Sequence, residues 1–342
     1  MSFHARLRHL ALATFVVGGA AQAALAADDP ASFYQGRNVS FVVGFNTGGG
    51  ADAYARLVAR HLGRHIPGNP TIVVRNMQGA GSILAANHIF NLSPKDGSEI
   101  GLFAGNIAID PVIGGVPAKY DSREFTWIGN PAAEVDVCIA RPEKGFKSFD
   151  TLFAREMVTG TAGTATWDFP VALNSILKTK FKLVKGYNGS NALKLALERD
   201  EIDGYCGVGW DALRAGGLTR DKVDVLLQFT ASRDPDLPDV PAVMELARNP
   251  QERQLMTLIF GWVAMSRPIA APPGIPPERA KALRDAFDAT MKDPALLADS
   301  EREMLPVQPM SGAEITRFVQ EVYRTPKDVA AKAAVILGRT EH

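Results

Sequence analysis

The sequence predicts an α/β protein of two lobes, with mixed, mostly parallel sheets, a hinge and a cleft between the lobes. Three observations lead to this fold class. Short apolar segments alternate with amphipathic segments of helical spacing, an order that is typical of parallel α/β sheets. Glycine-rich loops follow several of the apolar segments. The chain of 342 residues is also long enough for two compact domains.

The predicted elements follow from the spacing of apolar residues. The strands are expected at Val39–Phe45, Thr71–Arg75, Glu99–Phe103, Val135–Ala140, Met157–Gly160, Lys182–Gly186, Ile202–Val208 and Val223–Phe229. The helices between them are expected at Ala51–His65, Ser82–Asn91, Phe169–Thr179 and Asn191–Arg199. From Pro276 onwards the chain is expected to be largely helical, and Ser311 with Glu314 is typical of a capping box.

Two apolar segments with flanking Gly or Pro, 125–136 and 255–267, have the character of strands that cross between lobes. They predict one lobe in two pieces, residues 36–134 together with 258–342, and a second lobe at 135–257. Lys and Arg number 37, as do Asp and Glu. Because no net charge favours a polyanion or a membrane surface, we expect no nucleic-acid partner.

The N-terminus has the pattern of an export signal. Arg6 and Arg8 precede the apolar run Leu10–Ala20, and small residues with an Ala-x-Ala cleavage pattern follow. The run is shorter than the ~20 apolar residues of a membrane span. Residues 1–26 are therefore predicted to be a signal peptide that directs the mature chain to the periplasm. In that oxidising compartment, Cys138 and Cys206 could pair or stay buried free thiols, and we favour the unpaired state.

Three junctions each consist of a strand, a glycine-rich loop and a helix. The first loop is Asn46–Gly50, the second is Gly79–Ser82, and the third is Thr159–Thr166. Such a junction directs unpaired main-chain N–H groups and the positive end of the helix dipole at the space above the strand. The sequence thus predicts a cleft for a small anion, with Phe45 beside the first loop and Gly81 and Ser82 in the second.

Two further residues near these loops have predicted roles. Asp52 lies in the first turn of the helix after the first loop, where it would repel an anionic ligand but can bond the loop's own N–H groups and Arg56. We assign Asp52 to support of the loop. Tyr187 follows the strand Lys182–Gly186 at the expected edge of the cleft, which indicates a secondary ligand contact.

Motifs for catalysis or for a cofactor are not recognisable. The first loop lacks the Gly-Lys-Ser/Thr of a nucleotide-binding loop, and Gly-x-Ser-x-Gly does not occur. His61 and His65 have the spacing of a helical metal pair, but no third ligand accompanies them in a known pattern. We therefore predict a binding protein without enzymatic activity, metal or cofactor.

The residues Val42 to Arg56, which read VVGFNTGGGADAYAR, resemble the opening of the tripartite tricarboxylate transporter substrate-binding receptors, also called the Bug family. The resemblance extends over nearly all of the mature chain. It continues in order through Val73–Ser82, Pro94–Gly97, Phe125–Gly129, Gly160–Thr164, Gly186–Gly189, Leu237–Pro241 and Pro272–Pro276.

The resemblance implies a periplasmic, type II-like binding protein that closes on a small carboxylate and delivers it to membrane permease subunits. It also implies that the carboxylate is held largely by main-chain and hydroxyl groups of one loop in each lobe. The residues that correspond to these loops are Asn46, Thr47, Gly48 and Gly49 in the first lobe and Thr161, Ala162, Gly163 and Thr164 in the second. We expect the receptor to be a monomer.

Several alternatives remain open at this point. An exported enzyme with the same bilobed fold, or a receptor that reports its ligand to a signalling membrane protein, would share these features. The ligand could be a dicarboxylate, a tricarboxylate or an aromatic acid, because the same N–H groups would serve one carboxylate of each. The first loop starts with Gly44-Phe45-Asn46 where the resembling receptors often have Pro-Phe-Pro.

Overall fold

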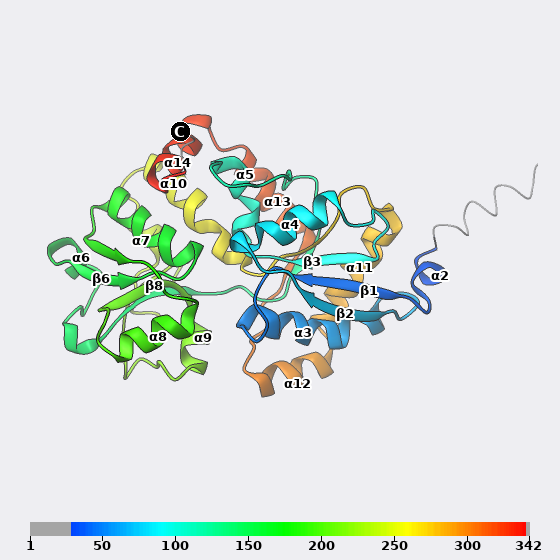
Figure 1. The fold of residues 1–342 in the computed structure, drawn as a ribbon, viewed down its shortest axis with the longest axis horizontal. Helices are drawn as coiled ribbons and strands as arrows, with labels where there is room; N and C mark the ends of the chain where they lie inside the picture. Colours follow the sequence, from blue (N-terminus) through cyan, green and yellow to red (C-terminus); the bar gives the residue numbers. More distant parts are fainter. Residues whose placement is uncertain (1–28, 340–342) are drawn as a thin grey trace, which may run out of the picture.

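The computed structural model describes residues 29–339, which form two α/β lobes placed side by side (Figure 1). The predicted fold class is confirmed. The predicted signal peptide, residues 1–26, lies outside the described residues. Within the described range, no helix combines the length and the apolar character that crossing a bilayer requires.

The first lobe is built on a six-stranded sheet. Its strands are β1 (Asn38–Val43), β2 (Thr71–Asn76), β3 (Glu99–Leu102), β4 (Thr126–Asn130), β10 (Ile269–Ala271) and β11 (Met310–Ser311). They are ordered β11-β4-β10-β3-β1-β2, with β2, β1 and β3 parallel and the pairs that involve β10 and β4 antiparallel.

The second lobe is built on a five-stranded sheet. Its strands are β5 (Asp136–Ala140), β6 (Met157–Gly160), β7 (Phe181–Val184), β8 (Gly204–Gly209) and β9 (Asp224–Gln228). Their order is β7-β6-β8-β5-β9, with β7, β6 and β8 parallel and β5 antiparallel to both of its neighbours. Each sheet thus has a parallel core of three strands and antiparallel pairs beside it.

Helices cover both faces of the sheets. In the first lobe they are α2 (Pro30–Tyr34), α3 (Gly50–Leu62), α4 (Ile83–Asn91), α5 (Asp110–Ile113), α11 (Pro277–Thr290), α12 (Pro294–Glu303) and α13 (Gly312–Tyr323). With the second sheet lie α6 (Thr151–Ala154), α7 (Thr164–Leu177), α8 (Ser190–Glu198), α9 (Trp210–Ala215) and α10 (Pro250–Phe260), and α14 (Lys327–Ile336) closes the chain.

The alternation along β1 shows how the sequence selects the two faces. Phe41 and Val43 are buried with Leu57 and Val58 of α3, whereas Val42 points to the other side and is buried with Ile83 of α4. Successive side chains of a strand point to opposite faces, so a strand with apolar residues at every position must be covered by helices on both sides. This burial fixes where β1 ends and where the first glycine loop begins.

The chain passes between the two sheets at residues 131–135 and again through α10 and the 3₁₀ helix η6 (Gly261–Met265). The prediction of a strand at 255–267 is therefore wrong. Leu255, Ile259 and Val263 are buried at intervals of four residues, which is the helical period that the continuous apolar run obscured. The Ser266 hydroxyl donates to the Ala132 carbonyl at 3.1 Å and ties the two passages together.

The C-terminal helix lies where the lobes adjoin. Figure 1 shows α14 beside α10 and close to α7, and both pairs are in contact, as are α14 and α5. The predicted lobe boundaries at residues 134 and 258 stay a prediction.

Cys138 and Cys206 lie opposite each other on the antiparallel strands β5 and β8 and form a disulfide. The expectation of two unpaired thiols is corrected. Both residues are fully buried, and the register of the two strands brings their Cα atoms to 3.9 Å. The register of strands distant in sequence is decided by the packed sheet, and the spacing of two cysteines alone does not reveal it.

We expect the disulfide to stabilise the second lobe by on the order of 4 kcal/mol, because it closes a loop over a separation of 68 residues. The double substitution Cys138→Ala with Cys206→Ala should lower the free energy of unfolding in urea by that amount. Thiol titration of the unreduced, denatured parent protein should find no free thiol. Two free thiols in that titration would contradict the pairing.

Candidate functional site

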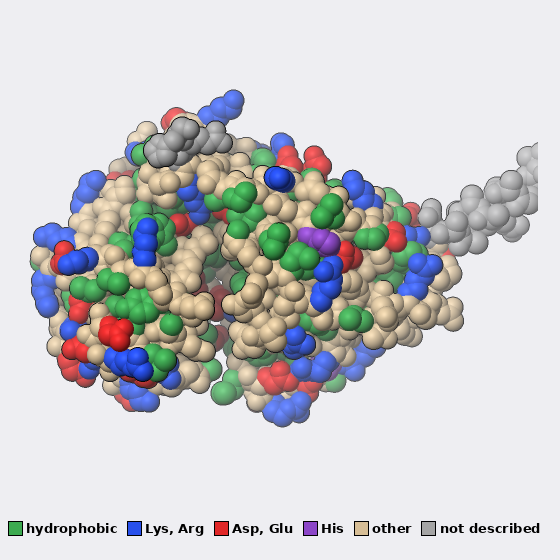
Figure 2. Space-filling model, in the orientation of Figure 1, with side chains coloured by type: hydrophobic (Ala, Val, Ile, Leu, Met, Phe, Trp, Pro, Cys, Tyr) green, Lys and Arg blue, Asp and Glu red, His purple; other side chains and the backbone are tan. Residues whose placement is uncertain are grey.

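The two lobes face each other across a hollow that Figure 2 shows between them. Helix α3 begins at the first glycine loop, after β1, and α7 begins at the third, after β6. The second glycine loop approaches α7 closely, since a Cβ atom added to Gly81 would lie 2.9 Å from Oγ1 of Thr164. All three predicted loops therefore border the space between the lobes.

The first loop is exposed and is held by Asp52. Phe45 is half-buried, whereas Asn46, Thr47, Gly48 and Gly49 are exposed. The Gly48 N–H donates to Oδ2 of Asp52 at 2.8 Å, and the side-chain amide of Asn76 donates to Oδ1 of Asp52 at 2.9 Å. Gly48 has a φ of +82°, a conformation that glycine adopts at little cost.

Asp52 is nearly inaccessible to solvent. Its burial would raise the pKa of its carboxyl group, but hydrogen bonds from Arg56, the Gly48 N–H and Asn76 outweigh burial and lower that pKa. Asp52 is thus an anion that the first loop itself neutralises. The N–H groups of the first turn of α3 have no acceptor within their own helix and remain available to a ligand.

The second loop contains an unusual run of left-handed residues: Ala80, Gly81 and Ser82 have φ values of 46°, 61° and 74°. The Ser82 side chain, predicted to contact ligand, is buried. Its hydroxyl donates to the Gly44 carbonyl at 2.9 Å and accepts from the Ala104 N–H at 3.1 Å. Ser82 therefore secures the end of β1, and Gly81 is the residue of this loop that meets the second lobe.

The third loop is held by a hydroxyl in place of a carboxylate. Oγ1 of Thr166 accepts from the N–H groups of Ala162 and Gly163 at 2.7 and 2.9 Å, and it lies 2.9 Å from the Gly163 carbonyl. The Thr161 N–H donates to the Val184 carbonyl at 2.9 Å. Three of the predicted ligand donors are thus already paired.

The donors of the third loop that remain are the N–H groups of the first turn of α7, which starts at Thr164. The predicted start at Phe169 is five residues too late, because Pro170 reads as the start of a helix although it lies inside this one. Gly163 has a φ of 171° and nothing within 4 Å of an added Cβ, so its backbone does not require glycine.

Two other side chains border the third loop. The Tyr187 ring packs near Gly160, where an added Cβ would lie 3.1 Å from the ring carbon Cε2. Nζ of Lys185 lies 4.0 Å from the centre of the Trp167 ring, a cation–π contact. Lys185 follows β7 and brings a positive charge to the same edge of the sheet at which the third loop begins.

The sequence interpretation missed Arg267, which follows the second passage between the lobes. Its side chain is buried beside the start of α3, with Nη2 3.8 Å from the position of a Cβ at Gly50. Nη2 donates to Oε1 of Glu134 at 2.9 Å. Because Arg267 and Gly50 are far apart in the chain, no local motif could have connected them.

A buried ion-pair network joins the lobes beside the second loop. Arg339, which follows α14, donates to Oδ1 of Asp110 in α5 at 2.7 Å and also pairs with Asp168 in α7. Asn106 donates to the Gly81 carbonyl at 3.3 Å and to Oδ2 of Asp110 at 2.6 Å. The network therefore connects the second loop to α7.

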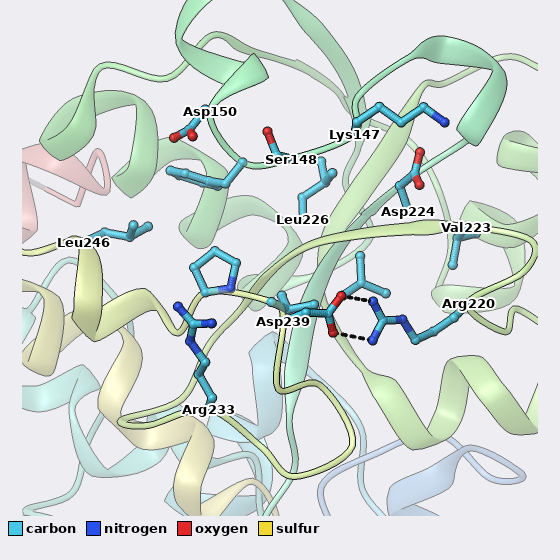
Figure 3. A pocket seen from close by; sticks show the side chains of 14 residues that line it. Lys147, Ser148, Asp150, Arg220, Val223, Asp224, Leu226, Arg233, Asp239 and Leu246 are labelled. Atoms are coloured by element: carbon cyan, nitrogen blue, oxygen red, sulfur yellow. Dashed lines mark hydrogen bonds and ion pairs between the residues drawn. The ribbon is translucent and has the colours of Figure 1, made fainter.

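A separate cavity of about 500 Å³ lies on the second lobe, between the residues before α6, strand β9 and the segment 233–246 (Figure 3). None of the predicted ligand-binding residues lines it. Arg220 and Asp239 form a two-bonded ion pair at its rim. Among residues 29–339, no group of three or more His, Cys, Asp or Glu side chains is arranged to hold a metal ion.

No protein-family model matches the chain. A curated relative, the UPF0065 protein in the tcbD–tcbE intergenic region of Pseudomonas sp. (strain P51), is 24% identical over 225 residues, or 64% of this chain. The chain spans just under two thirds of that relative's length, 65%.

Solved structures share the fold over most of the chain. A ligand-free TctC solute-binding protein from Polaromonas has a TM-score of 0.66 at 17% identity and covers 90% of this chain and 100% of its own. A Rhodopseudomonas palustris protein with adipate has a TM-score of 0.65 at 20% identity, and the match covers 88% of this chain and 98% of that one. MatC from the same organism, with bound malate, has a TM-score of 0.64 at 20% identity, and the match covers 86% of this chain and 99% of that one. The resemblance to TctC-type receptors is confirmed in the fold.

Thr166 is expected to stabilise the third loop through its hydroxyl. The substitution Thr166→Val should lower the free energy of unfolding by about 1–3 kcal/mol, because two main-chain N–H groups lose their acceptor. Thr166→Ser keeps the oxygen and should lose less. Urea unfolding followed by circular dichroism measures both, and equal stability of the Val variant and the parent would contradict this role.

The carboxyl group of Asp168 predicts a pH dependence. Burial raises its pKa to about 6, with the negative charge of Asp110 acting in the same direction and Arg339 opposing it. Between pH 4 and 6 the folded protein retains a proton that the unfolded chain releases, so stability falls as the pH rises through this window. Over this window, the titration of Asp168 lowers the free energy of unfolding by roughly 3 kcal/mol.

In Asp168→Asn this contribution disappears, so the decline of the unfolding free energy from pH 4 to 7 should become shallower. Asp110, whose pKa burial also raises, stays in the variant and contributes in the same direction. Urea unfolding at several pH values compares the two slopes. Identical slopes in parent and variant would contradict the assignment.

Proposed function

We propose that this protein is an exported solute-binding receptor that captures a small organic carboxylate between its lobes and delivers it to a tripartite tricarboxylate-type membrane transporter. The observation that carries this proposal is the pairing of two helix starts. Helices α3 and α7, one from each lobe, begin at the cleft and leave main-chain N–H groups without acceptors in their own helices.

Such groups favour an anion for two reasons. The N–H dipoles point at the ligand, and the helix dipole adds partial positive charge at the same place. Both helices have at least 13 residues, so each end carries a full set of first-turn amides. The carboxylates that Asp52 and Asp168 bring to these helices are already neutralised by Arg56 and Arg339. They therefore leave room for the charge of a ligand.

The ligand-binding loops belong to different lobes, so a bound ligand favours the closed arrangement. Asn46 to Gly49 would contact it from the first lobe, and Thr164 and the residues after it from the second. Movement of one lobe against the other about residues 131–135 and 261–268 would bury the ligand, the hinge mechanism of bilobed receptors. The permease would recognise the closed form.

The proposed destination follows from the sequence. The N-terminal pattern at residues 1–26 supports export of the mature receptor to the periplasm, where a monomer would shuttle between free ligand and the permease. The fold shared with the malate-bound and adipate-bound proteins supports a carboxylate ligand. Binding without turnover distinguishes this receptor from an enzyme on the same fold.

The test is a thermal-shift panel of organic acids with the mature protein, followed by recovery of the bound acid. A ligand present at 100 times its dissociation constant stabilises the folded state by about 2.7 kcal/mol, which raises the melting temperature. We expect at least one small carboxylate to do this and to be recovered chemically unchanged. If no acid raises the melting temperature, or if the acid is converted, the proposal fails.

Gly48→Val tests the first loop. A β-branched residue is disfavoured at the φ of +82° that Gly48 adopts, so the variant should lose the thermal shift by the acid while remaining folded. Gly36→Val is the matched control. Gly36 has a φ of +68° and, like Gly48, nothing within 4 Å of an added Cβ, but it precedes the N-terminal end of β1, whereas Gly48 follows the C-terminal end. The control variant should keep the shift. Loss of the shift in both variants, or in neither, would contradict the loop assignment.

A further inference from the structure

The base of the cleft contains one buried cation whose hydrogen-bonding capacity is only partly used. Arg267 is 8% exposed, and its guanidinium lies over the Tyr54 ring of α3 at 4.4 Å from the ring centre. Tyr54 is itself fixed, because its hydroxyl donates to the Pro306 carbonyl at 2.8 Å. The stacking holds the plane of the guanidinium beside the start of α3.

The contacts of Arg267 leave donors free. A guanidinium has five N–H groups. Nη1 donates to the Ser266 hydroxyl at 3.2 Å and Nη2 to Oε1 of Glu134 at 2.9 Å. Nε is buried and has no partner among the described residues. Nη1 and Nη2 each carry two N–H groups, and one hydrogen bond is formed by each nitrogen among the described residues, so the guanidinium keeps N–H groups for a ligand oxygen.

The cluster around Arg267 belongs to both lobes. Nη2 lies 3.8 Å from the position of a Cβ at Gly50, and the Glu134 carboxylate occupies the space that a side chain at Gly209, just before α9, would need. Burial raises the pKa of Tyr54 to about 12, and the charges of Glu134 and of Asp211 in α9 act in the same direction while Arg267 opposes them. The guanidinium is therefore placed where the two lobes meet.

The balance of charge around Arg267 is close to neutral in the absence of a ligand. Glu134 supplies one negative charge. Asp136 is fully enclosed, and burial and the Glu134 charge raise its pKa well above the usual range although Arg267 opposes them. Burial thus favours the neutral form of Asp136, and Glu134 is the carboxylate whose charge compensates the guanidinium. The partial positive charge of the α3 amides is left over.

From this arrangement we infer that Arg267 is a specificity-determining residue that pairs with a second negative charge of the ligand. The inference rests on the proposed function. One carboxylate of the ligand occupies the amides at the start of α7, and the other occupies the amides at the start of α3 together with the guanidinium. Arg267 thereby favours doubly charged carboxylates over singly charged ones, and Glu134 holds the guanidinium in place until the ligand arrives.

The experiment measures affinity for pairs of acids that differ only in the second carboxylate. Isothermal titration calorimetry with the mature protein compares succinate with butyrate and adipate with hexanoate. We expect the parent protein to bind at least one diacid ten or more times more tightly than its monoacid partner. Arg267→Gln should reduce this preference at least tenfold, through weaker binding of the diacid, while the affinity for the monoacid changes less than threefold.

Arg279→Gln is the matched control. Arg279 is likewise 8% exposed, has a buried Nε without a partner among the described residues and lies over an aromatic ring, Phe33, at 3.6 Å. It belongs to α11 and donates to the Asp96 carbonyl, on the first lobe beside α2. Its substitution should leave the preference for diacids unchanged, so a general loss of a buried arginine is separated from a loss of charge at the cleft.

Two more variants keep the inference falsifiable if Arg267→Gln does not fold. Arg267→Lys keeps the positive charge but loses the planar set of N–H donors of the guanidinium, so it should retain part of the preference for diacids. Glu134→Gln removes the competing carboxylate and should leave the affinity for the diacid equal or higher, whereas a purely structural ion pair would make that affinity fall. Circular dichroism and the melting temperature confirm folding for each variant.

The outcomes separate this inference from the proposed function. If the parent protein binds none of the organic acids in the wider panel, the proposed function fails. If it binds acids but shows no preference for the second carboxylate, or if a folded Arg267→Gln keeps the preference, only the role of Arg267 is overturned. The same holds if Glu134→Gln weakens binding of the diacid.

Discussion

The main constraint on this structure is that two helices must begin at one cleft with their first amides unpaired. An unpaired amide next to water is tolerated, but the loop before it must be held rigidly for the amide to point in one direction. The two lobes solve this with different acceptors. Asp52 holds the first loop through the Gly48 N–H, and the Thr166 hydroxyl holds the third loop through Ala162 and Gly163.

The choice of acceptor has an electrostatic consequence. The Asp52 carboxylate at the start of α3 lowers the positive potential there, and its ion pair with Arg56 offsets this effect. The hydroxyl of Thr166 carries no charge, so the start of α7 keeps its potential without a cation in the loop. Arg267 also lies beside Gly50, and its ion pair with Glu134 offsets part of the unfavourable desolvation of its guanidinium.

Much of the fold was accessible from the sequence because local periodicity determines it. The apolar run Val39–Phe45 predicts β1, and the glycines and the amphipathic segment that follow it predict the first loop and α3. The position of Asp52 in the first turn predicts that it bonds the N–H groups of this loop, as it does with Gly48. Features that depend on tertiary packing were missed. They include the Cys138–Cys206 pair, the helical passage at 255–267, and Arg267, whose neighbours come from distant parts of the chain.

Arg267 and Arg339 differ in how a motion of the lobes would affect their contacts. Ser266 and Glu134, which accept hydrogen bonds from the Arg267 guanidinium, lie in the segments that connect the lobes, so a rotation about these segments preserves both contacts. Arg339 pairs with Asp110 in α5 and with Asp168 in α7, which belong to different lobes. A rotation that separates α5 from α7 must break one of these two pairs. The cost of breaking it favours the arrangement in which Gly81 meets Thr164, and a ligand held by both helix starts would add to the same preference.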